Sequence, residues 1–173
     1  MNSLKYINST CILIVCSVLI GAFYFQFGLN EDPCPLCLLQ RMGMIGVIFG
    51  LALNSYFGFD SKHFAVVIIS ALVGLTFSTR HVLLHILPGD PGYGSPIFEY
   101  HLYTWGVFIF IASILGSALF LFYIDSFKRG STHAILNYEK YAVYLAAVII
   151  LINIIATIFE CQLGPCCEDG PCK

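Results

Sequence analysis

Long uncharged, apolar runs alternate with short polar segments along the whole chain. Five such runs cover residues 6–30, 42–59, 64–79, 100–124 and 141–159. A membrane-spanning helix needs about 20 mostly apolar residues, and the third run reaches that length when it is extended to residue 87. The pattern therefore predicts five membrane-spanning helices, at approximately residues 8–28, 42–58, 64–86, 102–124 and 141–159.

The composition supports a protein whose main solvent is lipid. Of the 173 residues, 58% are hydrophobic and 10% are charged, whereas an ordinary soluble domain has about 25% charged residues. The formal net charge is -2, and the chain has no basic stripe, so we expect no nucleic-acid partner.

The chain shows no internal repeat, low-complexity tract or long linker. We therefore predict a single transmembrane domain, residues 1–173, with an all-α membrane fold. It would be an antiparallel helix bundle with a four-helix core, a fifth C-terminal span and a cysteine-rich outer tail at residues 160–173. No small-residue cleavage site follows the first run, so we interpret it as an uncleaved span. Glycines in the predicted helices favour close packing in lipid; they are Gly43, Gly46, Gly50, Gly74 and Gly116.

Five lysines and arginines, before the first predicted span, between the second and third and between the fourth and fifth, fall on one side of the membrane. They are Lys5, Lys62, Lys128, Arg129 and Lys140. Acidic residues dominate the other side, where the terminal Lys173 is the one free basic residue. Because basic loops stay in the cytoplasm, we expect a cytoplasmic N-terminus and a periplasmic C-terminus.

Residues 33–41 read Pro-Cys-Pro-Leu-Cys-Leu-Leu-Gln-Arg and precede the second apolar run. If a helix begins near Cys34, then Cys34, Cys37 and Arg41 share one face. Cys37 would lie in the first turn, where the helix dipole and the Arg41 guanidinium both favour a thiolate. The motif predicts a reactive cysteine pair; the alternatives are a structural disulfide and half of a metal site.

Eight cysteines are distributed unevenly along the chain. Cys11 and Cys16 lie within the first predicted span, where we interpret them as apolar packing residues. The other six are predicted on the outer side; they are Cys34, Cys37, Cys161, Cys166, Cys167 and Cys172. Because disulfides persist in oxidising compartments and are rare in the cytosol, this segregation indicates thiol–disulfide chemistry on the outer side.

Four of these cysteines lie in the tail, which is punctuated by glycine and proline. We favour a Cys161–Cys166 disulfide, because a turn at Gly164 and Pro165 can bring the two together, whereas adjacent cysteines satisfy disulfide geometry poorly. A four-cysteine zinc site is the competing hypothesis. It would form within the tail or from Cys34, Cys37 and two tail cysteines.

Residues 34–41, at the outer start of the second predicted span, resemble the signature of the disulfide bond formation protein B (DsbB) family. In that family, three residues separate a Cys-x-x-Cys from an arginine. Residues 80–88 also resemble the corresponding part of the family, and the likeness extends over roughly residues 11–123. It implies a quinone-linked thiol oxidase of the bacterial inner membrane. Such an enzyme reoxidises a soluble, periplasmic, thioredoxin-fold (DsbA-like) dithiol oxidase and passes the electrons to ubiquinone or menaquinone.

The resemblance also implies roles for individual residues. Cys34 and Cys37 would form the redox pair, with Cys37 and Arg41 beside the quinone. By looser analogy His81 would contact the quinone, although a buried histidine bonded to backbone or water is an equal alternative. No resident metal is expected under this interpretation.

One departure from the family pattern concerns the second cysteine pair. Four-helix members carry it in the loop between the third and fourth helices, and residues 88–101 here contain no cysteine. We hypothesise that the tail supplies it, with Cys161 and Cys166 exchanging with the soluble partner and passing electrons to Cys34 and Cys37.

Two other classes of function remain open at this point. The first is a membrane metal-binding protein whose outer thiolates hold zinc or copper(I). The second is a structural anchor whose outer disulfides only staple loops. Electron flow in the opposite direction, as in a reductase, is also compatible with the sequence.

Overall fold

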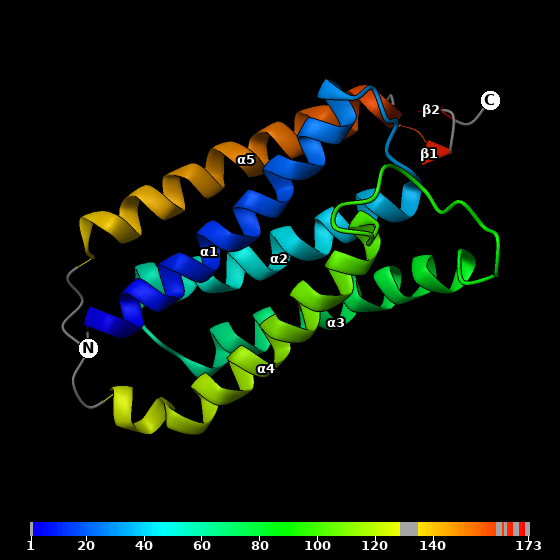
Figure 1. The fold of residues 1–173 in the computed structure, drawn as a ribbon. Coiled ribbons are helices and arrows are strands. Elements are labelled where there is room, and N and C mark those ends of the chain that lie inside the picture. The colour runs from blue at the N-terminus through cyan, green and yellow to red at the C-terminus, as the bar shows by residue number, and fades with distance from the viewer. Residues whose placement is uncertain (1, 129–134, 162–163, 165, 168–169, 172–173) are drawn as a thin grey trace.

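The structure is a computed structural model, and it describes residues 2–128, 135–161, 164, 166–167 and 170–171 (Figure 1). Helix α1 covers Asn2–Phe23 and continues into a π-helical turn, η1, at Tyr24–Gly28. It is followed by α2 (Pro35–Phe57), α3 (Ser61–Leu84), α4 (Leu102–Lys128) and α5 (Asn137–Cys161). Beyond α5, two-residue strands β1 (Cys166–Cys167) and β2 (Gly170–Pro171) pair antiparallel.

The predicted all-α membrane fold is confirmed. Within the described residues, five helices are long and apolar enough to cross a membrane. Successive helices run in opposite directions along the bundle (Figure 1). As a result, the end of α1, the start of α2, the end of α3, the start of α4 and the end of α5 lie together.

Helix α2 occupies the centre of the bundle. It packs against α1, α3, α4 and α5, while α5 lies along α1 and α4 lies along α3. The central contact with α3 is close, because a Cβ atom at Gly43 would lie 2.7 Å from the Gly74 Cα atom. Phe110 of α4 fills the space beside these glycines and is fully buried. Gly46 and Gly50 also lie at the α2–α3 contact, whereas Gly116 faces open space and contributes no such contact.

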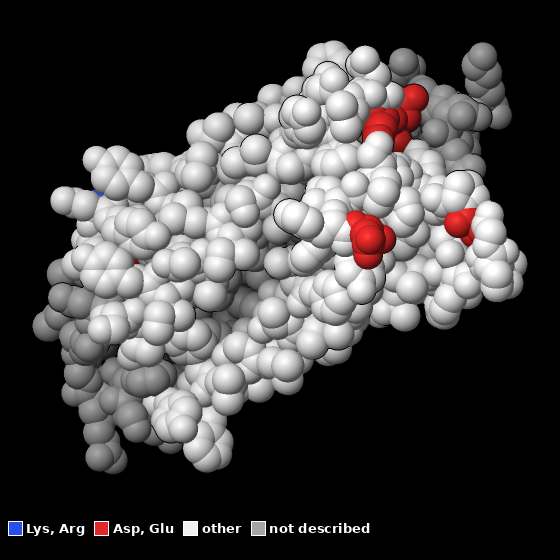
Figure 2. Space-filling view, in the orientation of Figure 1, with Lys and Arg blue, Asp and Glu red and all other residues white. Residues whose placement is uncertain are grey.

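Charge is distributed very unevenly over the surface. Figure 2 shows acidic side chains gathered at one end of the molecule and a long, uncharged flank. The acidic end is the one where α2 begins, and it includes Glu31, Asp32 and Asp90. At the opposite end, Lys5 of α1 pairs with the buried Glu139 of α5, with the two charged groups 3.9 Å apart.

Candidate active site

The two cysteines of the motif lie at the N-terminus of α2. Cys34 is the N-cap residue, and its Sγ accepts a hydrogen bond from the backbone N–H of Cys37 at 3.2 Å. Pro35 occupies the first helical position, where its missing N–H costs nothing. The predicted helix start near Cys34 is therefore confirmed. The two Sγ atoms lie 2.6 Å apart and both thiols are free, so only a small movement separates them from the roughly 2.05 Å of a disulfide.

Hydrogen bonds at this helix end favour a negative charge on Cys34. The Cys37 thiol is the strongest influence, and together with His81 and the Cys37 N–H it lowers the pKa of Cys34 from 9.0 to about 5, although burial opposes the shift. The sequence led us to expect the thiolate on Cys37. The structure favours Cys34, because its sulfur, at the N-cap, accepts hydrogen bonds from the thiol and the backbone N–H of Cys37.

His81 lies against this pair, in the last turn of α3. Its side chain is only 2% exposed, and both of its ring nitrogens are 3.9 Å from the Cys34 Sγ. Its Nδ1 atom also lies 3.2 Å from the Gln40 side-chain nitrogen, and its ring packs on Tyr103 with centroids 4.3 Å apart. These contacts place the imidazole where it can exchange a proton with the Cys34 sulfur.

Arg41 is buried one turn after Cys37, and its guanidinium points toward the end of α1. Nη1 donates to the Gln26 Oε1 atom at 2.7 Å, and Nη2 donates to the Ala22 carbonyl at 3.1 Å. The guanidinium also lies over the Phe23 ring, 5.4 Å from its centroid. The π-helical turn η1 carries Gln26, whose amide nitrogen donates to the Glu160 carboxylate of α5 at 3.3 Å.

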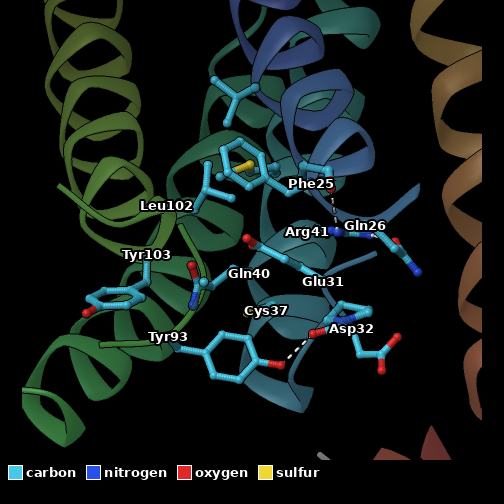
Figure 3. A pocket seen from close by; sticks show the side chains of 15 residues that line it. Phe25, Gln26, Glu31, Asp32, Cys37, Gln40, Arg41, Tyr93, Leu102 and Tyr103 are labelled. Atoms are coloured by element: carbon cyan, nitrogen blue, oxygen red, sulfur yellow. Dashed lines mark hydrogen bonds between the residues drawn. The ribbon is translucent and has the colours of Figure 1, made fainter. Parts of the chain in front are cut away.

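A cavity opens beside Cys37 (Figure 3). Its polar wall contains Gln26, Glu31, Asp32, Cys37, Gln40 and Arg41, while its apolar wall comes from α1, η1, α2 and α4. The apolar side chains are Val18, Ala22, Phe25, Met44 and Leu102. This combination suits a flat molecule that is apolar overall and carries a few hydrogen-bond acceptors.

The cysteine-free connection between α3 and α4 lines part of this cavity. Figure 3 shows Tyr93 of this connection reaching to Asp32, where its hydroxyl donates to the backbone carbonyl. Ser95 donates from both its backbone N–H and its hydroxyl to the Glu31 carboxylate. Since Tyr93 and Gly94 also line the cavity, the connection forms part of the site as well as joining two helices.

A second cavity lies between α2 and α5. Leu38, Met42 and Ile45 of α2 face Ile154, Ile158 and Cys161 of α5 across it. Arg41 borders both cavities. Cys161 is buried and disulfide-bonded, and the sulfur to which it is bound lies outside the described side chains.

The structure thus brings Cys34, Cys37, Arg41 and His81 together, and it places Cys161 across the second cavity from the start of α2. His81 contacts Cys34 and is not among the described residues that line the first cavity. The side chain of Cys166, and with it the predicted Cys161–Cys166 pairing, lies outside the described residues.

Sequence reasoning missed Gln26, Gln40, Glu160 and Tyr103 as parts of the site. An uncharged polar residue close to each end of an apolar run was the available signal for Gln26 and Gln40. For Glu160 and Tyr103, nothing in the local pattern separates these residues from ordinary side chains at the membrane boundary.

Comparison with known proteins gives one family. A family model described as "Disulfide bond formation protein DsbB" matches residues 5–95, which include Cys34, Cys37, Arg41 and His81. This match begins earlier and ends sooner than the likeness expected from the motifs, and it stops before α4.

Curated relatives match over the same region. A disulfide bond formation protein B of Pseudomonas syringae pv. tomato is 39% identical over 82 residues, which cover 44% of this chain and 48% of that protein. The proteins of the same description from Nitrosococcus oceani and Burkholderia pseudomallei (strain K96243) are 36% and 33% identical over 81 residues, covering 44% of this chain and 48% and 47% of theirs. The chain therefore matches about half the length of these relatives. No solved structure matches.

Proposed function

Because the chain belongs to the DsbB family of disulfide bond formation proteins, we propose that it is a quinone-dependent membrane thiol oxidase. It would reoxidise a soluble, periplasmic, thioredoxin-fold dithiol oxidase and pass the electrons to membrane quinone. The observation that carries this proposal is the pair of free thiols at the N-terminus of α2, with sulfurs 2.6 Å apart beside a cavity that also holds Arg41.

The redox step is an exchange of one disulfide for another. A thiolate of the incoming dithiol attacks the Cys34–Cys37 disulfide, and the second thiol of that donor then displaces the mixed disulfide. The donor becomes a disulfide, while Cys34 and Cys37 gain its two electrons and two protons. The hydrogen bonds from Cys37 and His81 stabilise the negative charge that the Cys34 sulfur acquires.

The first cavity fits a quinone ring. Its apolar walls suit the ring faces, and Arg41 can supply donors for a ring oxygen, because its hydrogen bonds to Gln26 and Ala22 use two of the five N–H groups of a guanidinium. A bound quinone supplies an acceptor for two electrons and two protons, so that the Cys34–Cys37 disulfide can form again. A cation held beside that oxygen stabilises negative charge as it develops.

We propose that the tail provides the second redox pair, with Cys161 and Cys166 as its members. In support, Cys161 is already disulfide-bonded and borders the cavity that Arg41 and Leu38 also border. Replacing Cys161 and Cys166 with alanine should stop oxidation of the protein partner while quinone reduction by a small dithiol continues. Unchanged partner oxidation would refute this role of the tail.

The proposed location is the bacterial inner membrane, with the N-terminus in the cytoplasm and the acidic end of the bundle in the periplasm. The distribution of lysine and arginine supports this orientation. Labelling of the reduced protein in intact cells with a membrane-impermeant thiol reagent checks it. Modification of Cys37 only after the cells are opened would contradict it.

A metal centre is the alternative that the cysteines raise. Cys34, Cys37 and His81 form the one group of metal-binding side chains found among the described residues, with ligand atoms within 4.8 Å of one another. Two thiolates on one zinc ion lie about 3.8 Å apart, as follows from Zn–S bonds of about 2.3 Å in a tetrahedron. The observed 2.6 Å is much closer to a sulfur–sulfur bond, and it therefore favours redox chemistry.

The decisive experiment uses the purified protein in detergent with a reduced thioredoxin-fold partner and a short-chain quinone. We expect quinone reduction that is lost in Cys37→Ser and kept in Cys11→Ser, which replaces a free thiol of α1 away from the site. Quinone reduction by the Cys37→Ser protein, with its helix content intact, would contradict the proposal. Stoichiometric bound metal with reduced thiols after isolation in air would favour the alternative.

A further inference from the structure

We infer that the fifth helix is part of the active site, because Glu160 of α5 positions Arg41 through Gln26. This inference rests on the proposed redox function and adds two positioning residues to it. Glu160 lies outside residues 5–95, which the family model matches, so its role comes from the structure of this chain.

Gln26 joins the two charged groups directly. Its Oε1 atom accepts from the Arg41 Nη1 at 2.7 Å, and its Nε2 atom donates to the Glu160 Oε2 at 3.3 Å. A guanidinium can only donate and a carboxylate can only accept. The amide therefore has one orientation that satisfies both neighbours, and the Gln26 side chain, which is 7% exposed, is fixed at both ends.

The backbone around Gln26 is suited to this bridge. Residues Tyr24–Gly28 form a π-helical turn, and such turns change the direction of the side chains that follow them. Arg41 is attached to the same stretch a second time, through the Ala22 carbonyl. The guanidinium is thus held against the end of α1 by two hydrogen bonds, one of which depends on a partner from α5.

Electrostatics give Glu160 a second effect. Arg41 is 9% exposed, and a buried cation is costly unless an opposite charge compensates it. The Glu160 carboxylate supplies that charge from the far side of the Gln26 amide, and it acts electrostatically on Arg41, as Cys37 does. Glu160 therefore weakens the positive field at the redox pair and makes the reduced, partly anionic form of Cys34 and Cys37 less stable.

Two substitutions separate these effects. Glu160→Gln removes the charge but keeps a side-chain oxygen that accepts from Gln26, whereas Glu160→Ala removes both. Glu99→Gln is the matched control, because it removes one negative charge from an exposed residue of the α3–α4 connection. All three proteins are compared with the parent in the full-length chain, and helix content and thermal unfolding are recorded for each.

The first measurement is the equilibrium of the Cys34–Cys37 pair with a glutathione buffer. Removing the carboxylate should raise the equilibrium constant for reduction in both Glu160 variants, because the reduced, partly anionic pair is then more stable. We expect a rise of about threefold, since a charge outside direct contact is partly screened. For a two-electron couple a threefold change corresponds to a potential about 15 mV higher. The Glu99→Gln value should stay at that of the parent.

The second measurement is steady-state quinone reduction with a small dithiol as donor. Glu160→Ala should raise the KM for quinone about tenfold, the effect of losing one hydrogen bond in a positioning chain, and Glu160→Gln should stay within about twofold of the parent. Glu160→Ala values that equal those of Glu99→Gln in both measurements would overturn the inference. Absence of quinone reduction in the parent would instead refute the proposed function, and the glutathione equilibrium would still test the link between Glu160 and the redox pair.

Discussion

Replacing Cys37 with alanine tests where the reduced cysteine pair carries its negative charge. The Cys37 thiol is the largest influence that lowers the pKa of Cys34 to about 5. Cys37→Ala removes this donor but leaves the backbone N–H of residue 37 and the contact with His81 in place. Cys37→Ser is the matched control, because its hydroxyl still donates a hydrogen bond to the Cys34 sulfur.

The size of the effect follows from the strength of one hydrogen bond to a charged group. Such a bond contributes about 1.5–3 kcal/mol, which corresponds to about one to two pH units. We therefore expect the pKa of Cys34 to rise by about one to two units in Cys37→Ala, and by less than half of that in Cys37→Ser. Since the pKa is lowered in the folded protein, the thiolate is present above about pH 5 and is lost as the pH falls through that value.

Reactivity reports the whole lowering of the Cys34 pKa from 9.0 to about 5, and not the smaller rise expected in Cys37→Ala. At pH 6 a thiol with a pKa of about 5 is about 900 times more ionised than one at 9.0. The intrinsic nucleophilicity of the thiolate falls by about 60-fold over the same four units. The net advantage of Cys34 in alkylation is then about 15-fold at pH 6 and nearly vanishes at pH 7, so that the measurement belongs at the lower pH.

The primary assay is the ultraviolet absorbance of thiolate in the reduced, detergent-solubilised protein. The protein is titrated from about pH 4 to about pH 10, which covers the pKa expected for Cys34 and that of an ordinary thiol. This readout requires only proton exchange, which suits a side chain that is 4% exposed. Cys34→Ser identifies the signal, because the acidic titration should be absent from that variant. A single midpoint near 9 in the parent, or an acidic midpoint that Cys37→Ala leaves unchanged, would refute the assignment of the charge to Cys34.

Three further predictions concern the cavity, the helix contact and the loops at the acidic end of the bundle. Arg41→Lys keeps the positive charge but loses the planar array of N–H donors, so the KM for quinone in steady-state reduction should rise about tenfold. An unchanged KM would show that Arg41 does not contact the quinone. Gly74→Ala places a methyl group against the Phe110 ring and should lower the free energy of unfolding by about 1–3 kcal/mol in denaturant titrations. Gly116→Ala, which faces open space, should change it by less than about 0.5 kcal/mol, and equal effects would contradict the packing argument. Tyr93→Phe removes the hydrogen bond from Tyr93 to the Asp32 carbonyl, and alkylation of Cys34 and Cys37 by an impermeant reagent should become about fivefold faster, as expected for about 1 kcal/mol; an unchanged rate would show that this bond does not restrain the loop.

The membrane architecture could be predicted from sequence because lipid imposes a simple rule. Each span must be long and nearly free of charge, and that requirement is visible in a single chain. The helix boundaries were less predictable. Hydropathy predicts the second span at residues 42–58, whereas α2 begins at Pro35. The cysteine motif predicts a helix start near Cys34 instead, because a cap residue and a proline can begin a helix within a stretch that hydropathy alone treats as a loop.

The contacts of Arg41 could not be predicted, for a physical reason. Gln26 and Glu160 lie 15 and 119 positions from Arg41 in the sequence, and their meeting depends on the π-helical turn at Tyr24–Gly28. Periodicity arguments assume 3.6 residues per turn, and a π-helical turn breaks that register without a signature in the apolar pattern. The motif therefore predicted a candidate pair of cysteines, while the side chains that contact Arg41 required the folded structure.

The burial of Arg41 also changes the interpretation of α5. A guanidinium held among apolar helices requires a compensating negative charge, and within the described residues the carboxylate linked to it by hydrogen bonds comes from Glu160. That residue immediately precedes Cys161, which is disulfide-bonded. A rearrangement of the tail disulfide would therefore act one residue away from the group that compensates Arg41, and through Gln26 it would reach the redox pair. In this chain the fifth helix brings the tail to the same end of the bundle as the site and also connects it to Arg41 through hydrogen bonds.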